Sequence, residues 1–182
     1  MGSAILVAAR LSKRDVLFNA LAETMNRVKR KALFVMCVWV ALIFVTSSFV
    51  IPFNTFVQFI QGLSEHYAFK QWFAQFWLVS WFFVVKGWHA TEYAIMTCIG
   101  TAVLHKWTNW SYTRCVAAAL AFAVLFATSD EWHQTFVPGR DGCVKDVLID
   151  SMGAGIAVLI LVFGHSRKIE RIRRQSTERR TA

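Results

Sequence analysis

The sequence predicts an all-α integral membrane protein, a bundle of four transmembrane helices with an aromatic interfacial helical segment on its outward, non-cytoplasmic side. Of its 182 residues, 56% are hydrophobic and only 17% are charged, whereas a soluble domain has about 25% charged residues. The 20 Lys and Arg residues outnumber the 11 Asp and Glu residues, and most of them lie near the two ends of the chain. Between these ends lie uncharged runs long enough for a helix of about 20 residues to cross a bilayer.

The charge distribution divides the chain into three parts. Residues 1–31 form a basic N-terminal segment with seven cations, residues 32–164 a membrane domain, and residues 165–182 a basic tail with seven more. A net charge of +9 would suit a nucleic-acid binder, but cations that flank an apolar middle favour contact with lipid headgroups. We therefore expect membrane lipids as partners and no nucleic acid. The tail after Lys168 is expected to be disordered or to adhere to the membrane.

Four spans are expected, and three of them are clear from the sequence. Residues 32–51 are uncharged between Lys31 and Pro52, and residues 113–129 and 147–164 form two further apolar runs. The middle of the chain leaves two possibilities, because Lys86, His89 and Glu92 interrupt the apolar residues 71–104. Either residues 86–104 span the membrane and residues 54–85 lie at the interface, or this run folds into two short spans.

Orientation follows from the bias of Lys and Arg toward cytoplasmic loops. With four spans, the N-terminus, the loop at 105–114 and the C-terminus share one side and carry 16 of the 20 basic residues. Five spans would place one basic terminus outside. We expect four spans in a bacterial cytoplasmic membrane with both termini in the cytoplasm. Residues 54–85 then lie on the outward side, where their many aromatic residues suit an interfacial or re-entrant helix.

The polar residues of the membrane domain occur in three places. His89, Glu92 and Tyr93 share one helix face near the start of the second span. A second group follows the third span at 130–141, and Asp146 and Asp150 stand one turn apart on the fourth. A charge within a span costs at least about 2.5 kcal/mol and marks a functional candidate.

Helix parity puts these three groups at the same outward depth. We expect the following residues to converge in one pocket: His89, Glu131, Gln134, Arg140, Asp146 and Asp150. The alternative is that they only pair and hold the helices together, as Arg140 with Asp146 would. No cofactor is identified and no Cys pair has metal-ligand spacing, although clustered carboxylates can hold a divalent cation.

The segment S-D-E-W-H-Q-T-F-V-P-G-R-D-G-C-V-K-D-V-L-I-D-S-M-G at 129–153 resembles the signature of the VanZ-like family, and K-G-W-H-A-T-E-Y at 86–93 is similar to a second family element. The resemblance covers residues 32–164. Its motif positions here are His89, Tyr93, Glu131, Gln134, Pro138, Gly139, Arg140, Asp146 and Asp150. The resemblance implies a first span, a variable outward stretch and three further spans, and an association with resistance to teicoplanin, a glycopeptide that acts on the cell envelope.

Two functions are expected, and a third is weaker. In the first, the pocket binds an envelope-related ligand, such as a lipid-linked precursor or a glycopeptide, and lowers susceptibility to teicoplanin. In the second, the protein is a hydrolase or transferase acting on the headgroup of a lipid-linked envelope intermediate. The third is a transporter with Asp150 as a proton site, which the lack of an inverted repeat disfavours.

The enzyme hypothesis assigns a role to each motif residue. His89 is the general acid or base, with Glu131 or Asp150 as its carboxylate partner, and Arg140 anchors a phosphate or carboxylate. Tyr93, Gln134 and Asp146 are expected to bind substrate. Because no Ser or Cys is visibly paired with a base, activation of water or an acceptor is favoured over a covalent mechanism.

Overall fold

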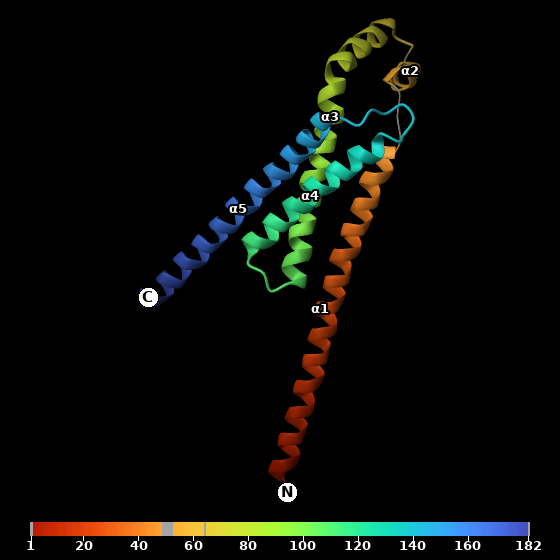
Figure 1. Ribbon diagram of the computed structural model, residues 1–182. Coiled ribbons are helices and arrows are strands. Elements are labelled where there is room, and N and C mark those ends of the chain that lie inside the picture. Colours follow the sequence, from red (N-terminus) through yellow and green to blue (C-terminus); the bar gives the residue numbers. More distant parts are fainter. Residues whose placement is uncertain (1, 49–52, 64, 182) are drawn as a thin grey trace.

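The structure is a computed structural model that describes residues 2–48, 53–63 and 65–181. Within these residues the chain forms five helices and no strand (Figure 1): α1 (Gly2–Ser48), α2 (Phe53–Gly62), α3 (Tyr67–Trp107), α4 (Tyr112–Gln134) and α5 (Val144–Thr181). The all-α prediction is confirmed. Three helices in the described part of the chain contain a stretch long and apolar enough to cross a membrane, namely Phe18–Ser48, Tyr112–Gln134 and Val144–Arg180.

The aromatic stretch 54–85 is not arranged as the sequence predicts. Residues 54–85 do not form one separate interfacial segment, because their first part belongs to α2 and residues 67–85 are the first half of α3. The 41 residues of α3 contain no proline, so nothing in the chain forces a break before Lys86. The second half of α3 carries the polar residues His89 and Glu92, and α3 is not one of the three helices with a stretch long and apolar enough to cross a membrane.

Helix α3 is also the centre of the bundle, since it packs against each of the other four helices. Its closest approach to α5 is at Gly153, where an added Cβ would meet the backbone carbonyl of Ala90. Small residues let helix backbones approach closely in a membrane protein. This crossing places Asp150, one turn before Gly153, beside the part of α3 that contains His89.

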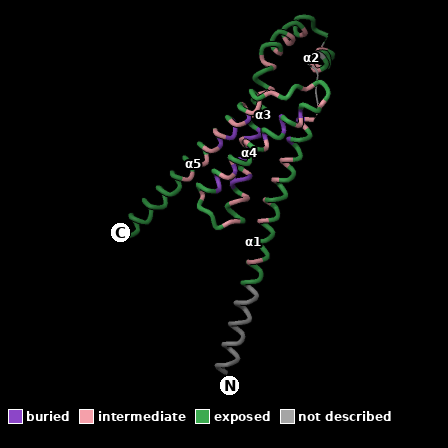
Figure 2. The backbone as a smooth tube through the Cα atoms, in the orientation of Figure 1, coloured by how far each residue is buried: buried purple, intermediate pink, exposed green. Residues whose placement is uncertain are grey.

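The core is narrow and combines three alanines with three larger side chains. Its buried members are Ile43, Tyr93, Met96, Ala123, Ala127 and Ala154. Figure 2 shows that most buried residues lie where α3, α4 and α5 meet the end of α1, and Val57 of α2 is also buried. By contrast, large apolar residues such as Leu125 and Ile160 are 70% and 66% exposed on the outside of the bundle, as is expected where lipid rather than water surrounds the protein.

The helices alternate in direction, so their ends gather in two places (Figure 1). The start of α1, the turn between α3 and α4, and the end of α5 lie toward one end; α2, the first half of α3 and the 135–143 loop lie at the other, called the α2 end below. The described residues of the two basic segments, 2–31 and 165–181, belong to the continuous helices α1 and α5. The tail after Lys168, expected to be disordered or membrane-adhering, is helical through Thr181, and no Gly or Pro follows Gly164 to end the helix.

Candidate functional site

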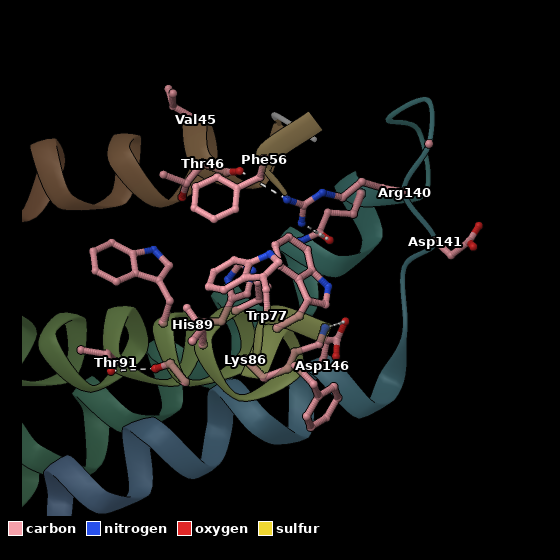
Figure 3. A pocket seen from close by; sticks show the side chains of 18 residues that line it. Val45, Thr46, Phe56, Trp77, Lys86, His89, Thr91, Arg140, Asp141 and Asp146 are labelled. Atoms are coloured by element: carbon pink, nitrogen blue, oxygen red, sulfur yellow. Dashed lines mark hydrogen bonds and ion pairs between the residues drawn. The ribbon is translucent and has the colours of Figure 1, made fainter. Parts of the chain in front are cut away.

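Polar side chains from five segments meet at the α2 end of the bundle (Figure 3): the end of α1, the middle of α3, the end of α4, the 135–143 loop and the start of α5. Because α3 and α5 leave this end and α4 arrives at it, three polar groups far apart in sequence reach the same level.

Gln134 is the centre of a chain of hydrogen bonds from the interior to the loop. Its Nε2 donates to Asp130 Oδ2 over 2.9 Å, and Ser47 Oγ donates to the same oxygen over 2.6 Å. On the other side, Gln134 Oε1 accepts from Arg140 Nη1 at 3.0 Å, and Arg140 Nη2 donates to the carbonyl oxygen of Thr46 at 3.4 Å. The amide therefore links a buried carboxylate to the guanidinium of the loop.

His89 has a carboxylate neighbour on its own helix. Its Nδ1 lies 3.3 Å from Glu92 Oε2, as the shared helix face predicts. Thr46 Oγ1 donates to the other oxygen of Glu92 over 3.1 Å, and Trp39 Nε1 donates to the backbone carbonyl of Glu92 over 3.0 Å. Glu92 is thus held between α1 and α3, and it presents one oxygen to the imidazole.

The two carboxylates expected to partner His89 are placed differently. Glu131 Oε2 accepts from the backbone N–H of Cys143, at 2.8 Å, and so caps the start of α5. Asp150 is buried in the interior, with only 2% of its surface exposed. The imidazole of His89 contacts Glu92 directly.

The ion pair at the start of α5 also differs from the Arg140–Asp146 pair that the sequence suggested. Asp146 Oδ2 lies 2.6 Å from Lys86 Nζ, whereas Arg140 contacts Gln134 and Thr46. The side chains of Lys86 and Asp146 are 26% and 21% exposed, so the pair is largely shielded from solvent.

A pocket of about 1060 Å³ opens beside these polar groups. Its wall is apolar and largely aromatic, and is formed by Val45, Phe56, Trp77, Trp81, Phe82, Val84, Val85 and Trp88. Its polar lining is formed by Thr46, Lys86, His89, Thr91, Gln134, Arg140, Asp141 and Asp146. Figure 3 shows Arg140 and Lys86 on opposite sides of this space, with the aromatic side chains between them. A volume of this size matches small-molecule sites, which are about 300–1,000 Å³.

The structure therefore brings His89, Gln134, Arg140 and Asp146 to the pocket. Tyr93 and Asp150, with Asp130 and Glu92, lie beneath it and are almost completely buried. Among the described residues, no group of three or more His, Cys, Asp and Glu side chains is placed to hold a metal ion.

Sequence reasoning missed the contribution of α1 and the aromatic wall. Thr46 and Ser47 donate to buried carboxylates, and Phe56, Trp77 and Trp81 line the pocket. The signal for α1 was present: Thr46, Ser47 and Ser48 are three consecutive hydroxyl residues in an otherwise apolar span. Hydroxyls at such a position suit interhelical hydrogen bonds.

These observations describe a helical membrane protein that has an amphipathic pocket above a buried polar network. The chain belongs to the VanZ/LLP1 family, whose sequence profile matches residues 32–165. The matched region contains every residue of the site and leaves out the two basic ends. No curated protein and no solved structure matches the chain significantly.

Proposed function

We propose that this protein crosses a bacterial cytoplasmic membrane four times, with both termini in the cytoplasm, and that its outward pocket binds the anionic headgroup of a cell-envelope amphiphile. A lipid-linked envelope precursor or a lipid-bearing glycopeptide has this chemistry. By binding such a ligand the protein lowers susceptibility to teicoplanin-type antibiotics.

The fourth span in this proposal is the second half of α3. Its residues Glu92, Tyr93, Met96, Thr97, Gly100 and Thr101 are buried in the bundle, so its polar side chains face protein rather than lipid, as charged residues in membrane helices do. The ends that carry 16 of the 20 basic residues then share one side, which the positive-inside rule makes cytoplasmic.

The two-sided chemistry of the pocket carries the proposal. One side is a wall of Trp, Phe and Val that suits an acyl or isoprenyl chain, and the other holds the cations Arg140 and Lys86. An amphiphile with an anionic headgroup fits both sides at once. A neutral lipid would offer nothing to the cations, and a free anion would leave the aromatic wall unused.

Arg140 is the anchor in this arrangement. A guanidinium has five N–H donors in a planar fork and binds phosphate or carboxylate in a bidentate manner. Gln134 and Thr46 accept from Nη1 and Nη2 and hold the fork in position. Both of these acceptors are neutral groups that orient the guanidinium.

The test is retention of lipid by the purified full-length protein. Wild type, Arg140→Gln and the control Arg114→Gln are extracted from the same bacterial membranes, and the bound lipids are identified by mass spectrometry. Arg114 is an exposed cation at the start of α4, away from the pocket. Wild type and the control should retain an anionic amphiphile that the Arg140 variant loses. Equal retention by all three proteins contradicts the proposal, and teicoplanin susceptibility of the same strains tests its biological part.

A second function, catalysis on that headgroup, is favoured by the contact between His89 and Glu92. A carboxylate 3.3 Å from Nδ1 orients an imidazole that lines the pocket, and such a pair suits a general base. In this version His89 takes a proton from water or from an acceptor hydroxyl, and Arg140 stabilises charge on the headgroup. Asp150 and Glu131 support the site from behind rather than contact the imidazole.

The enzyme version has its own comparison, between His89→Asn and His133→Asn. His133 stacks on Phe44 with ring centroids 4.5 Å apart and does not line the pocket. If the protein is an enzyme, lipid precursors incubated with wild type or with His133→Asn should be converted, and conversion should stop in His89→Asn. Conversion by the His89 variant at the wild-type rate refutes the role of this residue.

A further inference from the structure

Below the pocket, the buried oxygen atoms Tyr93 Oη, Asp130 Oδ1 and Asp150 Oδ1 have no hydrogen-bond partner among the described residues, and the nearby Glu92 Oε2 contacts only the imidazole of His89, at 3.3 Å. The four side chains are between 0% and 3% exposed. Buried polar atoms in folded proteins almost always have a partner, because an unpaired one costs free energy. Several such atoms in one place indicate that something satisfies them.

The tyrosine and the carboxylates lie close together. The Tyr93 hydroxyl is within electrostatic reach of Asp130 and Asp150, and of Glu131 and Glu92. Long side chains on a helix point back toward its N-terminus, so Tyr93 points toward the level of Ala90, where α3 meets Gly153 of α5. Asp150 stands one turn from Gly153 on the same helix.

The charges around this point do not balance. The ionisable groups that face it are Lys86, His89, Glu92 and Tyr93 on α3, Asp130 and Glu131 on α4, Arg140 in the loop, and Asp146 and Asp150 on α5; α1 contributes only the neutral Thr46 and Ser47. Five carboxylates thus face at most three cations, and buried charges without compensation are very costly.

The contacts show where the excess lies. Lys86 pairs with Asp146 and His89 with Glu92, and Glu131 accepts a backbone N–H. Asp130 is linked to Arg140 through the neutral amide of Gln134. Among the described residues, Asp130 and Asp150 form no direct ion pair, and each has one oxygen without a partner.

We propose that Asp130, Asp150 and Tyr93 form a buried binding site for one small monovalent cation, a proton or Na⁺, separate from the pocket. Carboxylate and phenol oxygens are hard ligands that suit Na⁺ rather than softer metals. A proton shared by two neighbouring carboxyl groups provides the same positive charge.

The site is tested on the purified full-length protein in lipid nanodiscs, with no pocket ligand present. The midpoint of thermal unfolding is measured as Na⁺ replaces a large organic cation at constant ionic strength, and separately as the pH is lowered from mildly alkaline to mildly acidic without Na⁺. A ligand that binds only the folded state raises its stability with ligand concentration. Wild type should therefore gain several degrees with rising Na⁺ if sodium is the ligand, or with falling pH if the proton is.

Three variants and one control decide the assignment. Asp150→Asn and Asp130→Asn keep the shape of the side chain but remove one charge, so each should lose the cation dependence. Tyr93→Phe keeps both carboxylates and should need about tenfold more cation, the cost of one hydrogen bond. Glu65→Gln, an exposed acid outside the cluster, should behave as wild type.

Wild type that responds to neither cation overturns the proposal. So does a response that persists unchanged in all three site variants. If the Asn variants do not fold, Tyr93→Phe still decides the question. Because no pocket ligand is present, the result is independent of whether Arg140 binds an envelope lipid.

Discussion

The contact between Gly153 and Ala90 allows a sharp test of the bundle. A Cβ at position 153 would collide with the Ala90 carbonyl, whereas a Cβ at Gly155, two residues later on the same helix, would meet nothing within 4 Å. Glycine in a helix is less stable than alanine by roughly 0.5–1 kcal/mol, so Gly155→Ala should raise the free energy of unfolding by that amount. Gly153→Ala gains the same helix propensity, but it overpacks the helix crossing at a cost of about 1–3 kcal/mol.

The two variants therefore have opposite signs although the chemical change is identical. Thermal unfolding in nanodiscs, followed by tryptophan fluorescence, should show Gly155→Ala melting at or above the wild-type temperature and Gly153→Ala melting below it. Gly153→Ala should also release lipid from the pocket, because α5 carries Asp146 and Asp150. If Gly153→Ala is as stable as Gly155→Ala, the close crossing of α3 and α5 is wrong.

Three further predictions concern the site. Ser47→Ala removes one of the two donors to Asp130 Oδ2 and should lower the free energy of unfolding by about 1–3 kcal/mol, as measured by thermal unfolding; an unchanged midpoint contradicts the contact. Gln134→Leu removes the amide between Asp130 and Arg140 and should weaken lipid retention as Arg140→Gln does, which the same mass spectrometry tests; full retention argues against the link. In a background without native cysteines, Arg140→Cys should react with an impermeant thiol reagent from outside intact cells and Ser111→Cys only after lysis, and the reverse pattern rejects the proposed orientation.

Residue spacing predicts contacts within one helix of the site better than it predicts contacts between helices. His89 and Glu92 are three residues apart on one helix, and this spacing fixes their contact whatever the rest of the fold does. The convergence of the three polar groups required only the alternating direction of consecutive helices. Spacing alone does not decide whether Glu131 or Asp150 lies near His89, because such contacts depend on how each helix is rotated about its axis, which a single sequence does not specify; Asp150 is within electrostatic reach of the imidazole.

The position of the aromatic stretch 54–85 could be predicted only in part, for a different reason. Composition indicates where Trp and Phe residues gather, but an interfacial helix and a pocket wall have the same composition. Phe56 of α2 stacks beside Trp77 of α3, with ring centroids 4.6 Å apart, and both line the pocket. These residues form a wall because α3 runs back past α2. This path is possible because residues 67–85 contain no helix-breaking residue.

Gln134 connects the two sites proposed here, and its side chain is chemically suited to that position. It must donate to Asp130 and accept from Arg140 at once, which an amide does and a carboxylate or an apolar side chain does not. When a cation neutralises Asp130, its attraction for the amide N–H weakens, and the hold of the amide on the guanidinium weakens with it. Occupancy of the buried site should therefore change how tightly Arg140 holds an anionic headgroup, and by thermodynamic reciprocity a bound headgroup should change the affinity for the cation by the same factor.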